Sequence, residues 1–312
     1  MIITKNVQTK EIIAQMAKKT FPEREVKSIT ELTEGMCNVT YCIVFGDGSE
    51  SILKIASKDT SGHTSNEICL MDAEVAAMKL VKENTDIRVA EVYNYDTSRS
   101  ICDGSYFFME KMSGESLFKI KDTLPNEELE RIYREIGILS HKLTAIQNPT
   151  FGLLGDKRRF HSLYDFVRLL LNNLISDAKK KDIDILFSRE ELLNALERDK
   201  AAFEKVEFAT LVHWDMWEGN IFVDGKHVTG IIDWERAMWG EAFMDDRFRY
   251  HNRNEAFLRG FGKITFLEEE KKRLRWYDII LYLTMMIEVF YRGFEEDGQY
   301  RWACGMLKKV YE

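Results

Sequence analysis

Three polar side chains within one short stretch have the types and the spacing that phosphoryl transfer requires. Asp215 is followed five positions later by Asn220, and Asp233 comes after a short hairpin. A carboxylate can accept or orient the proton of an attacking hydroxyl, and amide or carboxylate oxygens can hold Mg²⁺ against a polyphosphate. A loop of the form Asp-x-x-x-x-Asn can direct both side chains to one place, and a strand that ends in Asp233 can add a third. The stretch 211–235 therefore predicts a kinase active site, with His213 as a further catalytic candidate.

Each residue of this group also has an ordinary structural interpretation. His213 could be a buried core histidine, and the other three could be turn residues. The complete frame of His-x-Asp-x-x-x-x-Asn followed by Ile-Ile-Asp, with apolar strands on either side, arises by chance much more rarely than any one member. We therefore favour the catalytic interpretation.

A kinase site also needs a cation for the phosphates, and the N-terminal half offers Lys54. This lysine lies in the apolar alternating strand 51–56, so its side chain should face one surface of a sheet. Kinases pair such a lysine with a glutamate on a helix. Glu74, on a helix predicted over 67–83, is the best-placed partner, and Glu67 is the second choice. A solvated surface pair is the alternative interpretation.

The elements around these residues predict an α+β fold with two lobes, like that of protein kinases. An antiparallel sheet with one helix against it forms the N-terminal nucleotide-binding lobe, 1–112, and a larger, mostly helical part forms the catalytic and acceptor-binding lobe, 113–312. The predicted strands are 26–32, 39–45, 51–56, 88–95 and 105–112, with a tight turn at Gly46-Asp47-Gly48. The predicted helices are 6–20, 67–83, 126–146, 161–180, 188–205, 243–260 and 267–294, interrupted by a β-rich island at 208–234 with a turn at 224–226.

Composition narrows the setting in which such a protein works. The 312 residues carry a formal net charge of −8, which argues against a nucleic-acid partner because that binding needs Lys and Arg to neutralise phosphates. The beginning of the chain lacks the basic-then-apolar layout of a signal peptide, and the longest apolar run, 279–287, is too short to span a membrane. Scattered cysteines, without zinc spacing, indicate reduced thiols. We expect a cytoplasmic protein with no membrane partner, and the oligomeric state stays open.

The stretch 211–235 resembles the core motif of the aminoglycoside phosphotransferases and their choline-kinase-like relatives. The family's His-Gly-Asp, Gly-Asn-Ile and Ile-Asp-Trp-Glu correspond to His213-Trp214-Asp215, Gly219-Asn220-Ile221 and Ile232-Asp233-Trp234-Glu235. The resemblance implies Asp215 as the catalytic base, Asn220 and Asp233 as Mg²⁺ ligands, and ATP or GTP as the phosphoryl donor.

Two departures from the family pattern lie close to this motif. Trp214 replaces the usual small residue after the histidine, which would reshape the floor of the pocket. Glu241 and Ala242 stand in place of Asp and Pro in the family's Gly-Asp-Pro-x-x-Asp, which ends here at Asp245. We expect Asp245 to brace the catalytic loop and not to react.

The resemblance also implies residues at the nucleotide end. Gly35 and Asn38 match a Gly-x-x-Asn loop that covers phosphates, although a simple β-turn would look the same. The segment 107–112, with Glu110 and Met112, matches the hinge whose backbone contacts the nucleotide base. An apolar edge strand is the alternative interpretation of that segment.

Three rival functions are less consistent with the sequence. A protein kinase needs a peptide platform after its metal-binding Asp, and only eleven residues separate Asp233 from Asp245. A non-catalytic kinase-like module predicts the loss of a base or a metal ligand, yet Lys54, Asp215, Asn220 and Asp233 are all present. A metal hydrolase would need a second histidine cluster, which the scattered histidines do not supply.

The acceptor is expected to be a small molecule with a hydroxyl group, and an aminoglycoside is favoured. A polycationic acceptor would suit an acidic rim made of Glu235, Glu241, Asp246 and Glu295-Glu296-Asp297. Choline would instead suit an aromatic cage made from Trp214, Trp217, Trp234, Trp239, Trp276 and Tyr277, although helix aromatics more often lie in the core. Sugars, macrolides and other amino alcohols also remain open.

Overall fold

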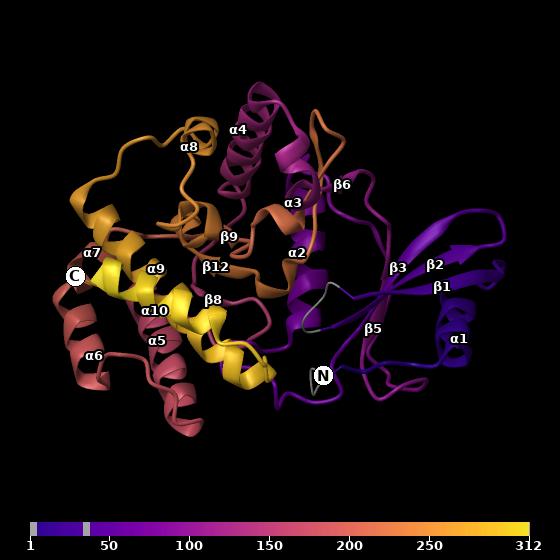
Figure 1. Ribbon diagram of the computed structural model, residues 1–312, viewed down its shortest axis with the longest axis horizontal. Coiled ribbons are helices and arrows are strands. Elements are labelled where there is room, and N and C mark those ends of the chain that lie inside the picture. Colours follow the sequence, from indigo (N-terminus) through magenta and orange to yellow (C-terminus); the bar gives the residue numbers. More distant parts are fainter. Residues whose placement is uncertain (1–4, 34–37, 312) are drawn as a thin grey trace.

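A five-stranded antiparallel sheet forms the N-terminal part of the protein, which the computed structural model describes over residues 5–33 and 38–311 (Figure 1). Its strands lie in the order β1-β2-β3-β5-β4. Their bounds are β1 Val26–Leu32, β2 Val39–Phe45, β3 Glu50–Ile55, β4 Val92–Asp96 and β5 Tyr106–Met109. The first three strands match their predicted bounds to within one residue. The alternation of buried and half-buried residues in β2 and the glycine turn between β2 and β3 leave little choice of register for this pair.

Two helices cover opposite faces of this sheet. Helix α1 (Lys10–Thr20) packs on the face that carries Leu53, together with Tyr41 and Phe108. Helix α2 (Leu70–Asn84) belongs to the apolar cluster that includes Ile52 and Phe107, which are on the other face. Because side chains alternate along β3, Lys54 shares the α2 face. The helix predicted from residue 6 begins only at Lys10, where the Thr9 hydroxyl accepts the Ile12 N–H.

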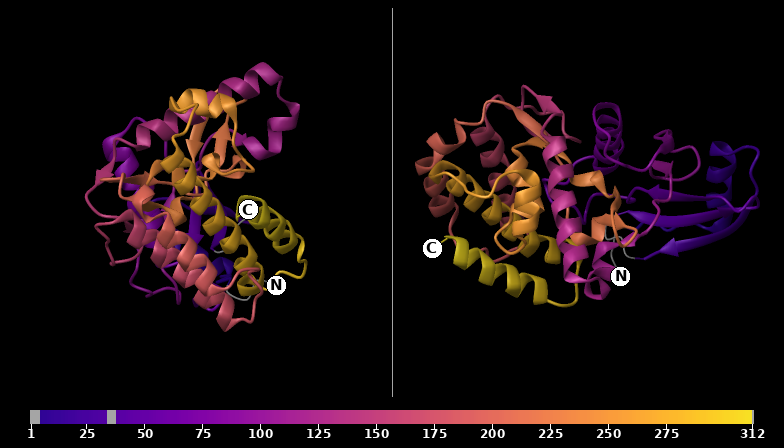
Figure 2. Two further views of the ribbon diagram at one scale, coloured as in Figure 1. Left: turned by 90° about the vertical axis from the view of Figure 1, so that its left-hand side faces the viewer. Right: turned by 90° about the horizontal axis from the view of Figure 1, so that it is seen from above.

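The remaining chain is mostly helical, and α9 runs through its centre (Figures 1 and 2). Trp276, Ile279, Leu283 and Ile287 on α9 are all essentially inaccessible to solvent. Helix α10 packs antiparallel along α9 and was not predicted, because its two glycines and the exposed Trp302 obscure the helical pattern. The helices are α3 Leu117–Ile120, α4 Asn126–Leu143, α5 Leu163–Lys180, α6 Arg189–Arg198, α7 Lys200–Phe203, α8 Glu255–Phe261, α9 Glu268–Arg292 and α10 Gly298–Tyr311.

The prediction of one helix over 243–260 is wrong. Two short 3₁₀ turns, Ala242–Met244 and Asp246–Phe248, precede α8 instead. The physical reason is that buried polar side chains here bond across the fold. Arg247 donates from Nε to the Met216 carbonyl at 2.7 Å, and Arg249 donates to the Phe243 carbonyl. These bonds stabilise an irregular backbone here, although the local sequence favours a helix.

Short strands frame the loops that carry the motif. β9 (Ala209–Val212) ends just before His213, β10 (Ile221–Val223) begins just after Asn220, and β11 (Val228–Ile231) ends two residues before Asp233. The predicted turn at 224–226 joins β10 to β11, with Gly225 in the left-handed region. The other short strands, which were not predicted because two or three residues show no periodicity, are β6 Glu115–Ser116, β7 Gln147–Asn148, β8 Gly152–Leu153 and β12 Met238–Gly240.

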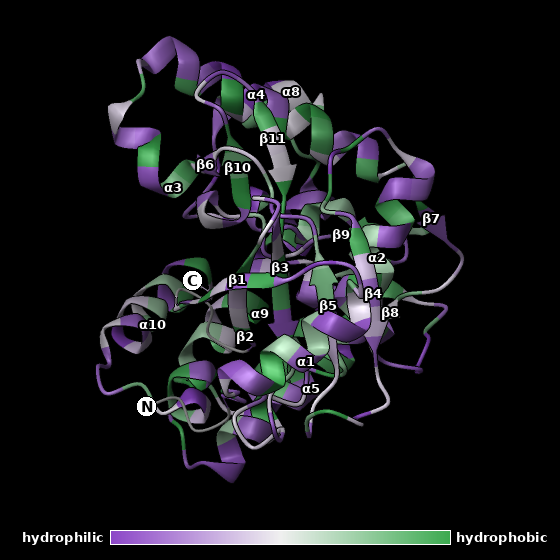
Figure 3. Ribbon diagram, turned by 90° about the vertical axis from the view of Figure 1, so that its right-hand side faces the viewer, coloured by the Kyte–Doolittle hydropathy of each residue, from purple (hydrophilic) through white to green (hydrophobic). Residues whose placement is uncertain are grey.

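The apolar core is continuous from the sheet into the helical part. One cluster includes Met78 of α2, Phe107 of β5 and Trp276 of α9. Figure 3 shows hydrophobic residues gathered in the strands and helices at the middle of the molecule, with polar residues on the outer loops. None of the helices that the structure describes is both long and apolar enough to cross a membrane. The α+β fold with an N-terminal antiparallel sheet is as predicted, while the division at residue 112 stays a prediction.

Candidate active site

The loop after β9 brings Asp215 and Asn220 into direct contact. The Asn220 amide nitrogen donates to the Asp215 carbonyl at 2.9 Å and to its Oδ2 at 3.3 Å. Because the amide nitrogen is used in this way, the amide oxygen is left for a cation. Burial, together with the carboxylates of Asp233 and Asp246, outweighs the attraction of Arg236 and raises the pKa of Asp215 to about 8. A pKa close to the operating pH suits a group that exchanges protons, and the ionised form of the carboxyl group is the one that accepts a proton.

His213 lies beneath this loop and is fully buried. Its Nε2 lies 2.9 Å from the Ile232 carbonyl and its Nδ1 accepts the Asp215 N–H at 3.3 Å, which assigns the proton to Nε2. Burial lowers the pKa of His213 to about 4, so the ring is neutral at physiological pH. A buried, neutral ring with both nitrogens engaged cannot reach a substrate. The structure therefore favours a positioning role for His213 over the catalytic role suggested by the sequence.

Backbone bonds hold the loop of Asp233 against the loop of Asn220. The Ile232 N–H donates to the Asn220 carbonyl at 3.0 Å, while the Ile232 carbonyl is the partner of His213. Asp233 itself has φ of 65°, in the left-handed region that an aspartate tolerates better than most residues. The two loops therefore meet through Ile232 and Asn220, which are twelve positions apart in the sequence.

Lys54 of β3 joins the N-terminal sheet to this pair of loops. Its Nζ lies 2.5 Å from a Glu74 oxygen and 2.8 Å from Asp233 Oδ1. Burial disfavours the charge on Lys54, but Asp233, Glu74 and Glu235 outweigh burial and raise its pKa above the usual value. Burial likewise opposes ionisation of Asp233, yet Lys54 holds the pKa of Asp233 below its usual value. The structure thus places Glu74, the preferred of the two predicted partners, beside Lys54.

Glu235 is a further carboxylate at this point, and the sequence analysis assigned it to a rim. It is buried, and Asn38 donates from Nδ2 to its Oε2 at 2.8 Å. Burial, together with the neighbouring Asp233 carboxylate, raises the pKa of Glu235 to about 8. Oxygens of Glu74, Asp233 and Glu235 lie within 4.8 Å of one another, which is close enough to share a cation. The sequence did contain a signal that Glu235 belongs to the site, because this glutamate is the last residue of the Ile-Asp-Trp-Glu motif.

A hard divalent cation is the group that this donor set fits. Asn220 and Asp233 offer an amide oxygen and an ionised carboxylate, and Mg²⁺ takes oxygen ligands and keeps several waters.

Asp245 holds the backbone of the catalytic loop, since its Oδ2 accepts the Trp214 N–H at 3.1 Å. That bond confirms the expected bracing of the catalytic loop.

Other predicted residues lie apart from these contacts. Gly35 falls outside the described residues. Glu110 forms an ion pair with Arg88, and its N–H donates to the Glu91 carbonyl at 2.8 Å. Met112 is buried with its methyl group against Gly230, where a Cβ would lie 2.0 Å from it. A nucleotide-binding role for Glu110 and Met112 stays a prediction.

The acidic rim and the aromatic cage are not formed as the sequence suggested. Glu241 is bound at 2.7 Å by Arg273 and accepts the Tyr277 hydroxyl proton, so its charge is compensated in the interior. Trp234 and Trp276 are completely buried, which excludes them from a cage. The carboxylates of 295–297 are the part of the rim that remains on the surface.

Paired metal-ligand candidates, a carboxylate that could act as a base and a buried Lys–Glu pair are the groups expected at the site of a phosphotransferase on a kinase-like fold. A family model described as the phosphotransferase enzyme family matches residues 28–245. The chain belongs to this family.

Known structures agree with this fold. The structure of aminoglycoside phosphotransferase APH(4)-Ia with ADP and hygromycin B is similar, with a TM-score of 0.69 and 17% identity over 96% of this chain and 97% of that chain. The GDP and kanamycin complex of APH(2")-IIIa has a TM-score of 0.65 and 15% identity over 96% and 98% of the two chains.

A curated relative from Arabidopsis thaliana, "Probable acyl-CoA dehydrogenase IBR3", is 25% identical over 228 residues, which are 70% of this chain. The chain spans about a quarter of the length of the curated relatives it matches. The similarity therefore covers one part of each of these relatives.

Proposed function

We propose that the protein transfers the γ-phosphate of ATP or GTP to a hydroxyl group of a small molecule, with Mg²⁺ as the cofactor. The observation that carries the proposal is the convergence of Lys54, Glu74, Asn220 and Asp233 beside Asp215. Five groups from two separate parts of the fold meet through contacts of 2.5 to 3.3 Å. Their chemical types are those that positioning and charge neutralisation in phosphoryl transfer require.

Each residue has a distinct task in this mechanism. Lys54, oriented by Glu74, binds phosphate oxygens of the nucleotide. Asn220 and Asp233 would hold the cation, and the chemistry that the cation would supply is neutralisation of charge on the phosphates. Asp215 orients the acceptor hydroxyl and accepts its proton as the new O–P bond forms and the bond to the leaving nucleoside diphosphate breaks. His213 and Asp245 keep the backbone of Asp215 in place.

The favoured acceptor is an aminoglycoside-like, cationic molecule. Two carboxylates on the C-terminal side, Asp246 and Glu288, lie close enough to Asp215 to raise its pKa. Glu288 is paired with Arg236, whereas the Asp246 side chain accepts a bond from the Asn252 amide. A carboxylate next to the base can attract an ammonium group of the acceptor. Two of the similar solved structures contain hygromycin B and kanamycin, which supports the same class. A sugar, a macrolide or an amino alcohol is the alternative acceptor.

A phosphate-transfer assay tests this proposal. The purified protein is incubated with Mg²⁺, γ-labelled ATP or GTP, and panels of aminoglycosides, amino alcohols, sugars and macrolides, and labelled products are separated. We expect transfer to at least one cationic acceptor and its loss when Mg²⁺ is chelated. If nucleotide binds but no panel member receives phosphate, and no slow hydrolysis occurs, a non-catalytic nucleotide-binding module becomes the better interpretation.

A further inference from the structure

Trp214 has a backbone conformation that a bulky residue seldom adopts. Its φ of 72° lies in the left-handed region, where glycine is favoured and where the resembling family has a small residue. A side chain kept at such a position needs surroundings that fix it, and backbone strain of this kind concentrates at functional sites. The contacts of the Trp214 indole ring therefore matter for the residue that follows it, Asp215.

The indole ring of Trp214 packs against the guanidinium group of Arg236. The guanidinium carbon lies 5.5 Å from the ring centroid, within the range of a cation–π interaction. The Trp214 backbone is held at the same time by Asp245. Trp214 immediately precedes Asp215, and Arg236 is three residues after Asp233. One side-chain contact thus links the two catalytic loops.

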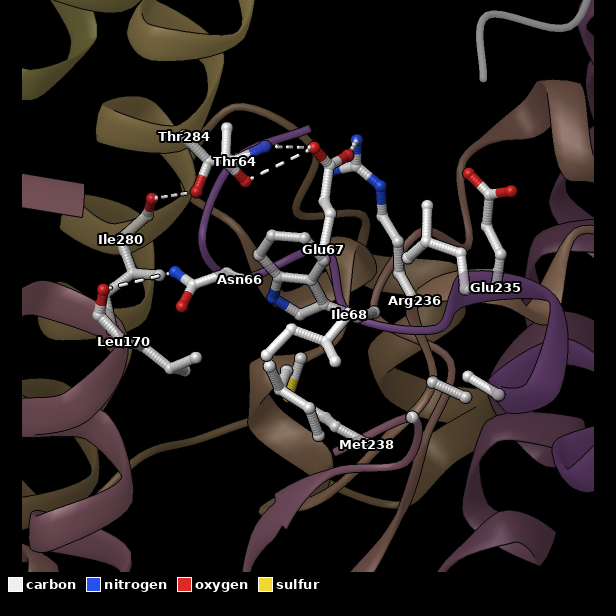
Figure 4. Close-up of a pocket in the computed structure, with 16 residues that line it drawn as sticks. Thr64, Asn66, Glu67, Ile68, Leu170, Glu235, Arg236, Met238, Ile280 and Thr284 are labelled. Carbon is white, nitrogen blue, oxygen red and sulfur yellow. Dashed lines mark hydrogen bonds and ion pairs between the residues drawn. The ribbon is translucent and has the colours of Figure 1, made fainter. Parts of the chain in front are cut away.

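Arg236 is itself fixed by an ion cluster that excludes most solvent. Its guanidinium lies 3.0 Å from Glu67 Oε1 and also pairs with Glu288, and Arg292 binds the same two carboxylates at 2.5 and 3.5 Å. The four side chains are at most 16% exposed, and their two positive and two negative charges balance. Figure 4 shows Glu67 and Arg236 meeting at the edge of a cavity of about 30 Å³.

The cluster connects separate parts of the chain. Glu67 lies in the segment that enters α2, the helix that carries Glu74, and Glu288 belongs to the last turns of α9. Glu67, the second choice as a partner of Lys54, therefore has a different partner. Thr64 fixes the Glu67 carboxylate further, since its N–H donates to Oε2 at 2.9 Å.

We propose that Trp214 and Arg236 form a positioning pair that holds Asp215 in register with Asp233, anchored through Glu67 to the segment that enters α2. This inference rests on the proposed function, in which Asp215 serves the acceptor and Asp233 the cation. The two ends of the reaction must stay aligned, because a misplacement of about 1 Å can cost roughly 10²-fold in rate. Trp214 and Arg236 touch neither reacting group in this scheme.

Steady-state kinetics of matched variants test the pair. We expect Trp214→Gly, which suits the left-handed backbone, to lower kcat by about 10- to 10²-fold with the nucleotide KM within about twofold. Trp214→Phe should recover most of the loss because it keeps a ring, and Arg236→Lys should retain more activity than Arg236→Gln. The double variant Trp214→Gly/Arg236→Gln should be no slower than the slower single variant. Arg259→Gln, which breaks an exposed ion pair with Glu130, is the control and should leave kcat unchanged.

Hydrogen exchange of residues 214–220 separates this inference from the proposed function. If the unaltered protein shows no phosphate transfer, the proposed function fails, but faster exchange of these amides in both single variants and not in the control would still support the pair. Unchanged exchange would overturn it. In an active enzyme, a Trp214→Gly variant with full kcat, or a double variant whose losses multiply, would also overturn the positioning pair.

Discussion

The catalytic loops and the C-terminal helices that border them use their polar side chains in different ways. In the loops, Asp215, Asn220 and His213 bond to one another and to the adjacent backbone. On the helical side, carboxylates such as Glu241 are bound by cations from distant parts of the chain. Local bonds make the loops predictable from motif spacing. Charges on the helical side cannot be assigned to a surface or to an interior until the fold is known.

The cation site should give the largest effect on catalysis. Asp233→Ala removes a metal ligand and leaves Lys54 with Glu74 alone, so we expect transfer to fall below detection and Mg²⁺-dependent nucleotide binding to weaken. Titration calorimetry with Mg·ATP measures the binding. Asp224→Ala, in the exposed turn between β10 and β11, serves as the control. Full activity and unchanged Mg·ATP affinity in Asp233→Ala would show that this residue only ends a strand.

Loss of the ion pair between Lys54 and Glu74 should have a smaller but still large effect on catalysis. In Glu74→Gln, Lys54 keeps its contact with Asp233 but loses its buried counter-charge, so the lysine no longer points at the phosphates. We expect kcat/KM for the nucleotide to fall by roughly 10²-fold, the typical consequence of a misplaced catalytic group. The matched control is Glu83→Gln on the same helix, where an exposed pair with Lys79 is lost. Equal activity of the two variants would remove Glu74 from the site.

The brace under the catalytic loop should make stability depend on pH. Burial, with the neighbouring Asp246 carboxylate, raises the pKa of Asp245 to about 7. The folded state therefore retains a proton that the unfolded state has lost above about pH 4, and stability falls as pH rises from there to 7, by up to about 1.4 kcal/mol per pH unit.

Asp245→Asn keeps an oxygen to accept the Trp214 N–H but cannot titrate. Urea unfolding between pH 5 and 8 should therefore show a shallower decline for this variant than for the unaltered protein. Parallel declines would mean that other carboxyl groups carry the pH dependence.

The surface carboxylates at 295–297 should give the smallest effect. They lie between α9 and α10, and Asp297 forms an i,i+4 pair with Arg301 on the surface. Replacing Glu295, Glu296 and Asp297 with Gln, Gln and Asn should raise the KM of a cationic acceptor only a few-fold, and salt should erase the difference because exposed charges are screened. The nucleotide KM should stay the same. A larger, salt-resistant increase would place these residues inside the acceptor site.

The sequence predicted the parts of the molecule whose pattern is local. The alternation in β2, the glycine turn that follows it, and the spacing of Asp215 and Asn220 each depend on neighbours a few residues away. The burial of Glu235 and the ion pairs of Glu67 and Glu241 depend on partners 32 to 225 positions distant. The irregular backbone around Arg247 and Arg249 depends on the same kind of contact, so helical periodicity was misleading there.

Replacing Asp215 tests the central claim most directly. Asp215→Asn is nearly isosteric and can still accept the bond from Asn220, so the fold and the affinity for Mg·ATP should be retained. Single-turnover transfer to the accepted small molecule should slow by roughly 10²–10⁴-fold, the usual contribution of a positioned acid–base group. Transfer at a near-normal rate, with the same acceptor and intact nucleotide binding, would contradict the assignment of Asp215 as the base.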